Sequence, residues 1–209
     1  MPTYNDYGIV LNSTDLNETD KILNIYTKEN ALVRAVCKGA RKPVGKFASK
    51  TDQLSCCYFQ FAKGKNLDTV CDLEQINGFS KLRASLPHLS HGILFLEVVS
   101  GFAHEKENES SEVYELLYSG LDNLQSASDP EIFSIKFIID FLSIHGFKPQ
   151  LETCVSCSLE VTSLDVILSK AKAPLSFKSV NSLGVPRSTQ IFIRIQVLLA
   201  GCFVESVQM

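Results

Sequence analysis

The hydrophobic pattern of this chain changes its period once, near Gly78. Before that point, short apolar stretches alternate with polar or Gly-containing turns, which is typical of strands. After it, apolar residues recur at the spacing of helices. A chain that places its strands first and its helices second is expected to fold as an α+β protein. Strands are predicted over residues 7–13, 20–27, 33–38, 54–61 and 67–76.

Five consecutive strands with one long loop after the third suggest a small closed barrel. The OB-fold is a five-stranded barrel that commonly binds oligonucleotides. We therefore predict an N-terminal OB-fold domain over residues 1–78 and an all-helical C-terminal domain over residues 79–209. In the fifth strand, alternation predicts that Thr69, Cys71 and Leu73 point into the barrel.

Three helices are predicted in the second part of the chain, over residues 86–102, 110–124 and 129–147. The last has a plausible N-cap in Asp129, Pro130 at its first position and a stop at Gly146. On the first, His88 and His91 have helical spacing but no carboxylate motif beside them. We expect these two histidines to serve packing or to lie at the surface, and not to bind metal.

Positive charge is concentrated around the third predicted strand and the loop after it. Residues 31–50 hold six of the 20 Lys and Arg and no acid, whereas the other 189 residues carry 14 basic and 23 acidic side chains. Arg34 and Lys38 alternate with apolar neighbours, so they are expected on the outer face of the strand. The residues predicted to bind DNA phosphates are Arg34, Lys38, Arg41, Lys42, Lys46 and Lys50, with Phe47 as a stacking surface.

Cations in this arrangement would neutralise phosphates and release counterions without reading bases. The competing interpretation is a solvated charged face with no ligand. The barrel class and the placement on one strand favour the phosphate-binding interpretation. Four other aromatic residues lie in the predicted barrel, namely Tyr26, Tyr58, Phe59 and Phe61. Each is expected to pack in the core rather than to offer a surface on which bases stack.

Seven cysteines occur without a disulfide-like framework, which fits a reducing cytosol. Cys37, Cys71 and one of the adjacent pair Cys56 and Cys57 are expected to pack as small hydrophobes. Cys154 and Cys157 have the spacing of half a zinc knuckle near residues 154–157. A structural zinc needs four ligands and no second pair follows. We therefore expect a degenerate site without metal, and no cofactor.

The sequence contains no Gly-rich phosphate loop, nucleophile elbow or carboxylate cluster suited to metal-assisted cleavage, so we expect no enzyme. The start, "MPTYNDYGIV", lacks the features of a secretory signal. The longest apolar run is interrupted by Arg194 and Gln196 and is shorter than the ~20 residues that span a bilayer. A cytoplasmic protein that does not enter the membrane is expected.

Several stretches together resemble the RecO family of bacterial DNA repair and recombination mediators, in the order found in that family. They run over about residues 7–157 and comprise "GIVLNSTDLNETDKILNIYTKE", "VRAVCKGARKP", "LDTV", "LRASLPHL" and "IHGFKPQLETCVSC". Two features depart from the family. Members with a zinc site carry two Cys-x-x-Cys pairs, and the last 40 residues match no pattern of the family.

The resemblance implies an OB-fold followed by a helical domain. It also implies binding of single- and double-stranded DNA, annealing of complementary strands, and RecA loading onto strands coated by single-strand-binding protein in the RecF pathway. The implied partners are RecR, the RecF pathway proteins and the C-terminal tail of single-strand-binding protein, in the bacterial cytoplasm at the nucleoid. From the residues alone, an RNA-binding OB module and a scaffold that grips an acidic protein stay open as alternatives.

Overall fold

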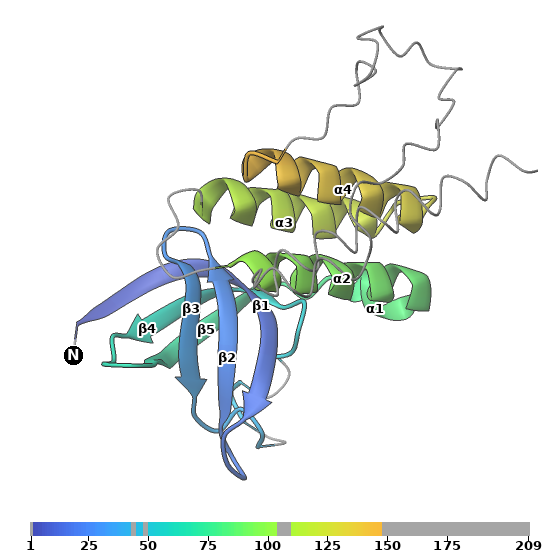
Figure 1. Cartoon of the computed structure of the whole chain (residues 1–209). Helices are drawn as coiled ribbons and strands as arrows, with labels where there is room; N and C mark the ends of the chain where they lie inside the picture. Colours follow the sequence, from blue (N-terminus) through green and yellow to red (C-terminus); the bar gives the residue numbers. More distant parts are fainter. Residues whose placement is uncertain (1, 43–44, 48–49, 104–109, 148–209) are drawn as a thin grey trace, which may run out of the picture. The chain divides into compact units, whose positions relative to one another are not determined.

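The computed structural model describes residues 2–42, 45–47, 50–103 and 110–147. These residues form an α+β fold in which a five-stranded barrel is followed by helices (Figure 1). No helix in this part of the chain is long and apolar enough to cross a membrane. The strands are β1 (Thr3–Asp15), β2 (Lys21–Thr27), β3 (Ala31–Cys37), β4 (Cys56–Ala62) and β5 (Asp68–Asn77). The helices are α1 (Ser80–Ala84), α2 (Leu86–Phe102), α3 (Ser110–Leu124) and α4 (Pro130–Ile144).

The barrel closes in the strand order β1-β2-β3-β5-β4. All neighbouring strands are antiparallel except β3 and β5, which run parallel with Ala35 opposite Asp68. The long strand β1 pairs with both β2 and β4, and its register shifts between Val10 and Asn12. A bulge of this kind lets one strand bend and serve two neighbours. The observed order is that of the predicted OB-fold, which is confirmed.

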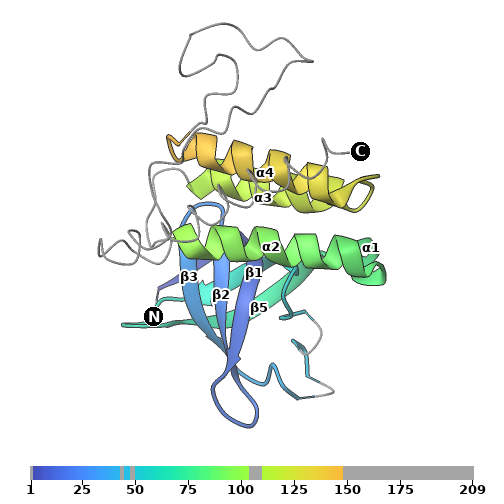
Figure 2. The same ribbon diagram turned by 45° about the vertical axis from the view of Figure 1, so that its right-hand side comes forward.

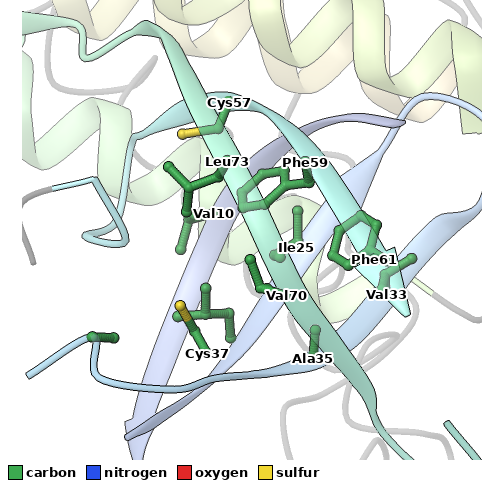
Figure 3. Packing of buried hydrophobic residues seen from close by; sticks show 12 residues of the cluster. Val10, Ile25, Val33, Ala35, Cys37, Cys57, Phe59, Phe61, Val70 and Leu73 are labelled. Atoms are coloured by element: carbon green, nitrogen blue, oxygen red, sulfur yellow. The ribbon is translucent and has the colours of Figure 1, made fainter. Parts of the chain in front are cut away.

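The barrel interior is filled by side chains from all five strands (Figure 3). Phe59 and Phe61 are fully buried and their ring centroids lie 5.3 Å apart. Full burial of a side chain of this size contributes roughly 1.5–3 kcal/mol. On β3, Val33, Ala35 and Cys37 point into this core, as their alternation predicts. Arg34, between Val33 and Ala35, is thereby held on the outside.

Two predicted orientations on β5 are wrong. Cys71 points outward and is exposed, and Thr69, which precedes the inward-pointing Val70, is only half-buried and is not part of the core. The register between β4 and β5 shifts at Gln60 and Phe61, whose partners are Asp72 and Val70. Cys71 is skipped in the pairing and Val70 takes the inward position instead. A bulge adds one residue to a strand and reverses the alternation beyond it. An alternating sequence pattern contains no signal for that extra residue.

Two further features were not expected. Both members of the adjacent cysteine pair are buried, since Cys57 lies in the barrel core and Cys56 contacts Tyr114 of α3, with Sγ 3.5 Å from Oη. Ala31, the first residue of β3, has a positive φ of 52°, which is uncommon for a residue with a side chain.

Helices α2, α3 and α4 follow their predicted ranges closely, whereas the short helix α1 was not predicted. α2 packs against the barrel and against α3 and α4, and α3 also contacts the barrel (Figure 2). The Asp129 side chain caps α4 by accepting the backbone N–H groups of Glu131 and Ile132 at 3.0 and 3.1 Å. Gly146, with a φ of 77°, follows the end of the helix. The Asp129 cap and the Gly146 stop are therefore confirmed.

The two histidines of α2 are used in packing. His88 contacts the Ser85 hydroxyl through Nδ1 at 2.8 Å and the Ala127 carbonyl through Nε2 at 3.1 Å. The Nδ1 atom of His91 lies 2.8 Å from the Ser134 hydroxyl on α4. Of the two expected roles, packing or a surface position, these contacts show packing for both side chains.

Barrel and helices touch at several points. The Ser110 hydroxyl at the start of α3 donates to the Lys28 carbonyl at 3.0 Å, and the Lys28 ammonium lies 2.6 Å from a Glu115 carboxylate oxygen. The ion pair raises the pKa of Lys28. Residues Met1–Phe147 form one compact unit, so the division into two domains after residue 78 stays a prediction.

Candidate nucleic-acid interface

The outer face of β3 carries the first of the predicted phosphate ligands. Arg34 is exposed and lies opposite Asn24 of β2. The Asn24 side-chain amide donates to the side-chain Oδ1 of Asn12 on β1 at 2.5 Å. Lys38 is exposed directly after the strand. Side chains alternate between the two faces of a strand. Because Val33, Ala35 and Cys37 point into the barrel core, Arg34 and Lys38 face solvent.

The turn after β3 is organised by a carboxylate. Asp20 accepts the backbone N–H of Gly39 at 2.8 Å, the Thr19 hydroxyl at 2.9 Å and the Asn17 amide at 3.0 Å. These bonds, led by that from Gly39, lower the pKa of Asp20 below its ordinary value. Gly39 has a φ of 73°, a conformation that L side chains rarely adopt. Asp20 thus holds the backbone between Lys38 and the following cations.

Sequence reasoning did not identify Asp20 as a positioning residue. A signal was present, because Asn17 accepts the backbone N–H groups of Thr19 and Asp20 at 2.9 and 2.8 Å. Asn side chains commonly form such turns with the residues two or three positions on. No local pattern reveals the hydrogen bond between Asp20 and Gly39, which lie 19 positions apart.

Arg41 is attached to the β1–β2 loop. Its Nη1 donates to the Asn17 carbonyl at 2.6 Å and its Nη2 lies 3.3 Å from a carboxylate oxygen of Asp15. Lys42 is exposed, and its carbonyl accepts the Gly45 N–H at 2.9 Å. The two adjacent cations therefore differ, since one is held by a carboxylate and the other is solvated.

The end of the loop lies against the barrel. Lys46 is ion-paired with Asp72 of β5 at 2.7 Å, and its Nζ lies 5.7 Å from the centroid of the Phe47 ring. The hydrogen bond from Lys46 lowers the pKa of Asp72. Phe47 packs partly against the barrel core, which leaves only part of its ring for stacking. Lys50 is half-buried and its carbonyl accepts the Cys57 thiol at 3.5 Å.

The six cations fall into two groups. Arg41 and Lys46 pair with carboxylates at exposed positions, where such pairs contribute only ~0–1 kcal/mol and exchange readily for other anions. Within the described residues, four form no ion pair with a carboxylate, namely Arg34, Lys38, Lys42 and Lys50. The structure thus places the seven predicted residues on one strand and its following loop, with four cations available to an anion.

Cys154 and Cys157, the half zinc knuckle of the sequence, lie outside the described residues. In the part of the chain that the structure describes, no group of three His, Cys, Asp or Glu could hold a metal ion. Burial raises the pKa of the Cys37 and Cys57 thiols to about 12. These two thiols stay protonated at neutral pH and act as core side chains.

Comparison with known proteins finds two family models along the chain. Residues 1–79 match "Recombination protein O N terminal" and residues 83–190 match "Recombination protein O C terminal". A DNA repair protein RecO of Thermobifida fusca is 30% identical over 161 residues, which cover 76% of this chain and 66% of that protein.

Further relatives carry the same name. The DNA repair protein RecO of Symbiobacterium thermophilum is 33% identical over 161 residues, covering 77% of this chain and 63% of the relative. That of Dehalococcoides mccartyi is 28% identical over 194 residues, covering 91% and 72%. The match to the Thermobifida and Symbiobacterium proteins spans slightly less than two thirds of their length.

Proposed function

The chain belongs to the RecO family, and from that premise we propose that it is a DNA repair protein that mediates homologous recombination. It binds single- and double-stranded DNA through the outer face of β3 and the loop that follows. The observation that carries this proposal is the set of four cations without carboxylate partners among the described residues, on β3 and the loop that follows it in an OB-fold.

Phosphate contact by Lys and Arg needs no base recognition and therefore suits a protein that acts on any sequence. A surface that holds two backbones at once lowers their repulsion and raises the local strand concentration, which is the basis of annealing. If all six cations engage single-stranded DNA, the slope of log K against log salt is about −4, from ~0.7 per phosphate. Phe47 adds stacking through the exposed part of its ring.

The helices have the opposite charge and are assigned to protein partners. The four helices carry three Lys or Arg and six Asp or Glu, which disfavours wrapping of DNA around them. The proposed partners are RecR, the RecF pathway proteins and the C-terminal tail of single-strand-binding protein, with RecA loaded onto the coated strand. In this scheme the protein is a bacterial, nucleoid-associated mediator and not an enzyme.

The DNA-binding proposal is tested with Lys38→Ala/Lys42→Ala, which removes two solvated cations. We expect affinity for a single-stranded oligonucleotide to fall about 2- to 30-fold at low salt, from ~0.2–1 kcal/mol per exposed ion pair. Annealing should fall with it. The matched control is Lys81→Ala/Lys136→Ala, which removes the same charge from exposed positions on α1 and α4. Equal affinities for the two folded variants would overturn the proposal.

The mediator role is tested by annealing of strands coated with single-strand-binding protein, with and without RecR. Stimulation of annealing supports the mediator role. A protein that binds DNA but does not stimulate annealing would contradict it. An RNA strand of equal length, used as competitor, separates DNA mediation from an RNA-binding module. A chain that bound neither strand at low salt would instead be a scaffold for an acidic protein.

A further inference from the structure

A hollow of about 270 Å³ lies on the other side of Arg34 from the basic loop. It is bounded by the first half of β3 and by the turn between β4 and β5, and its lining includes Arg34, Lys63 and Lys65. The parallel pairing of β3 with β5 explains the position of the hollow. Since Ala35 lies opposite Asp68, the residues just before Asp68 lie beside the start of β3.

The hollow has an excess of positive charge. Its lining contains three cations and one acid, Asp68, and none of the three cations forms an ion pair within the described residues. The Asp68 carboxylate is already used, because one oxygen accepts the Tyr4 hydroxyl at 2.5 Å and the other accepts the Gly64 N–H at 2.9 Å. Burial and the neighbouring carboxylate raise the pKa of Tyr4, so the phenol stays protonated and donates.

The turn that carries the two lysines is closely folded. A Cβ at Gly64 would collide with the Leu67 carbonyl oxygen, so only glycine permits this path. Lys63 and Lys65 flank this glycine, and both line the hollow. The Lys63 N–H donates to the Pro2 carbonyl at 3.0 Å, and its Nζ lies 5.7 Å from the centroid of the Tyr4 ring. The lysines are therefore attached to a tightly constrained backbone.

We propose that this hollow binds a backbone phosphate of the strand that lies on β3, with Lys63 and Lys65 as its ligands beside Arg34. The inference rests on the proposed DNA binding and extends it to a second set of residues. The seven residues of β3 span ~23 Å at about 3.3 Å per residue. A DNA strand that reaches from the basic loop past Arg34 to the β4–β5 turn therefore places several of its phosphates along β3.

The test compares Lys63→Gln/Lys65→Gln with Lys81→Gln/Lys136→Gln, which changes the net charge equally. Affinity for a single-stranded oligonucleotide is measured by fluorescence anisotropy across a range of salt concentrations. We expect about a 2- to 30-fold loss for the hollow variant at low salt. Its salt slope should be shallower than the control's by about 0.7, the contribution of one phosphate. Thermal unfolding checks that both variants are folded.

The outcomes distinguish this inference from the proposed function. In one outcome, Lys38→Ala/Lys42→Ala weakens DNA binding while Lys63→Gln/Lys65→Gln matches its control in affinity and salt slope. That result would contradict the second phosphate site and would leave the proposed DNA binding by β3 and the basic loop supported. If the unmodified protein binds no strand at low salt, the proposed function fails and the inference fails with it. Loss of affinity and of slope in both variants supports one strand path across β3.

Discussion

Lys46 and Asp72 connect the basic loop to the barrel, with the ammonium nitrogen 2.7 Å from a carboxylate oxygen. Both side chains are largely in solvent, with exposed fractions of 62% and 50%. The same lysine is one of the predicted phosphate ligands. A bound strand must therefore compete with Asp72 for this cation.

The substitution Asp72→Asn is expected to strengthen DNA binding. The new side-chain amide would keep an acceptor for the Leu73 N–H, which Asp72 now accepts at 2.7 Å, but would no longer neutralise Lys46. We expect affinity for a single-stranded oligonucleotide to rise about 2- to 5-fold at low salt, the scale of one exposed ion pair. Anisotropy titrations measure this directly.

Glu74→Gln is the matched control, because Glu74 is an exposed acid on the same strand with no ion pair among the described residues. Both substitutions remove one negative charge from β5. If the two variants gain affinity equally, the effect is one of net charge alone and the release of Lys46 is not its cause.

Asp20 predicts a pH dependence of stability. Hydrogen bonds from Gly39, Asn17 and Thr19 lower its folded-state pKa below the ordinary 3.8. A group of this kind stabilises the fold above its unfolded pKa, and the contribution is lost as pH falls through the folded pKa. The wild type should therefore be more stable than Asp20→Asn near pH 7, and the difference should disappear well below pH 3.8.

Urea unfolding of both proteins at pH 7 and at pH 3 or lower measures this difference. Glu18→Gln, an exposed residue of the same loop, is the control and should follow the wild type at both pH values. A difference between the wild type and Asp20→Asn that is the same at both pH values would mean that charge on Asp20 does not hold the turn.

Local sequence patterns predicted most of the fold, because hydrophobic periodicity and capping residues mark where its strands and helices lie. The range predicted for α3 is the observed one, and α4 begins at Pro130 after the Asp129 cap, as its sequence signals indicate. β1 was predicted too short. Its outer residues pair with two different strands, and such pairing depends on contacts distant in sequence.

The site was predicted less completely, for a related reason. Charge composition identified the cations of β3 and the loop after it. It could not reveal which of them meet carboxylates, because Asp15 and Asp72 lie on other strands. Lys63 and Lys65 belong to a short hairpin turn with no unusual composition. Only the parallel pairing of β3 with β5 brings that turn beside Arg34.

The bulge at Cys71 predicts unequal thiol reactivity. Cys37 and Cys57 are buried and their pKa values are raised to about 12, so only a fraction on the order of 10⁻⁴ is thiolate at pH 8. Cys71 is exposed on the outside of the barrel. Brief alkylation of the native protein followed by peptide mapping should modify Cys71 at least ~10-fold faster than either buried thiol. Equal rates would mean that the register of β5 differs from the one described.

Substitution of Gly120 is expected to change the stability of the protein without changing its DNA binding. A Cβ at this position of α3 would lie 2.8 Å from Cδ2 and 3.0 Å from Cε2 of the Phe137 ring. That ring cannot easily retreat, because it stacks on Phe95 with centroids 3.8 Å apart and planes within 6°. Overpacking costs ~1–3 kcal/mol, which exceeds the ~1 kcal/mol that alanine gains over glycine in a helix.

We therefore expect Gly120→Ala to lower the free energy of unfolding by up to about 2 kcal/mol, the overpacking cost less the gain in helix propensity. Ser119→Ala, at the adjacent exposed position, should change it by less than about 0.5 kcal/mol. Both variants should bind single-stranded DNA like the wild type under conditions where they are folded, because the cations lie on the barrel. A Gly120→Ala protein as stable as the wild type would show that the aromatic stack yields. Weaker strand binding by the folded variant would place part of the DNA surface on the helices.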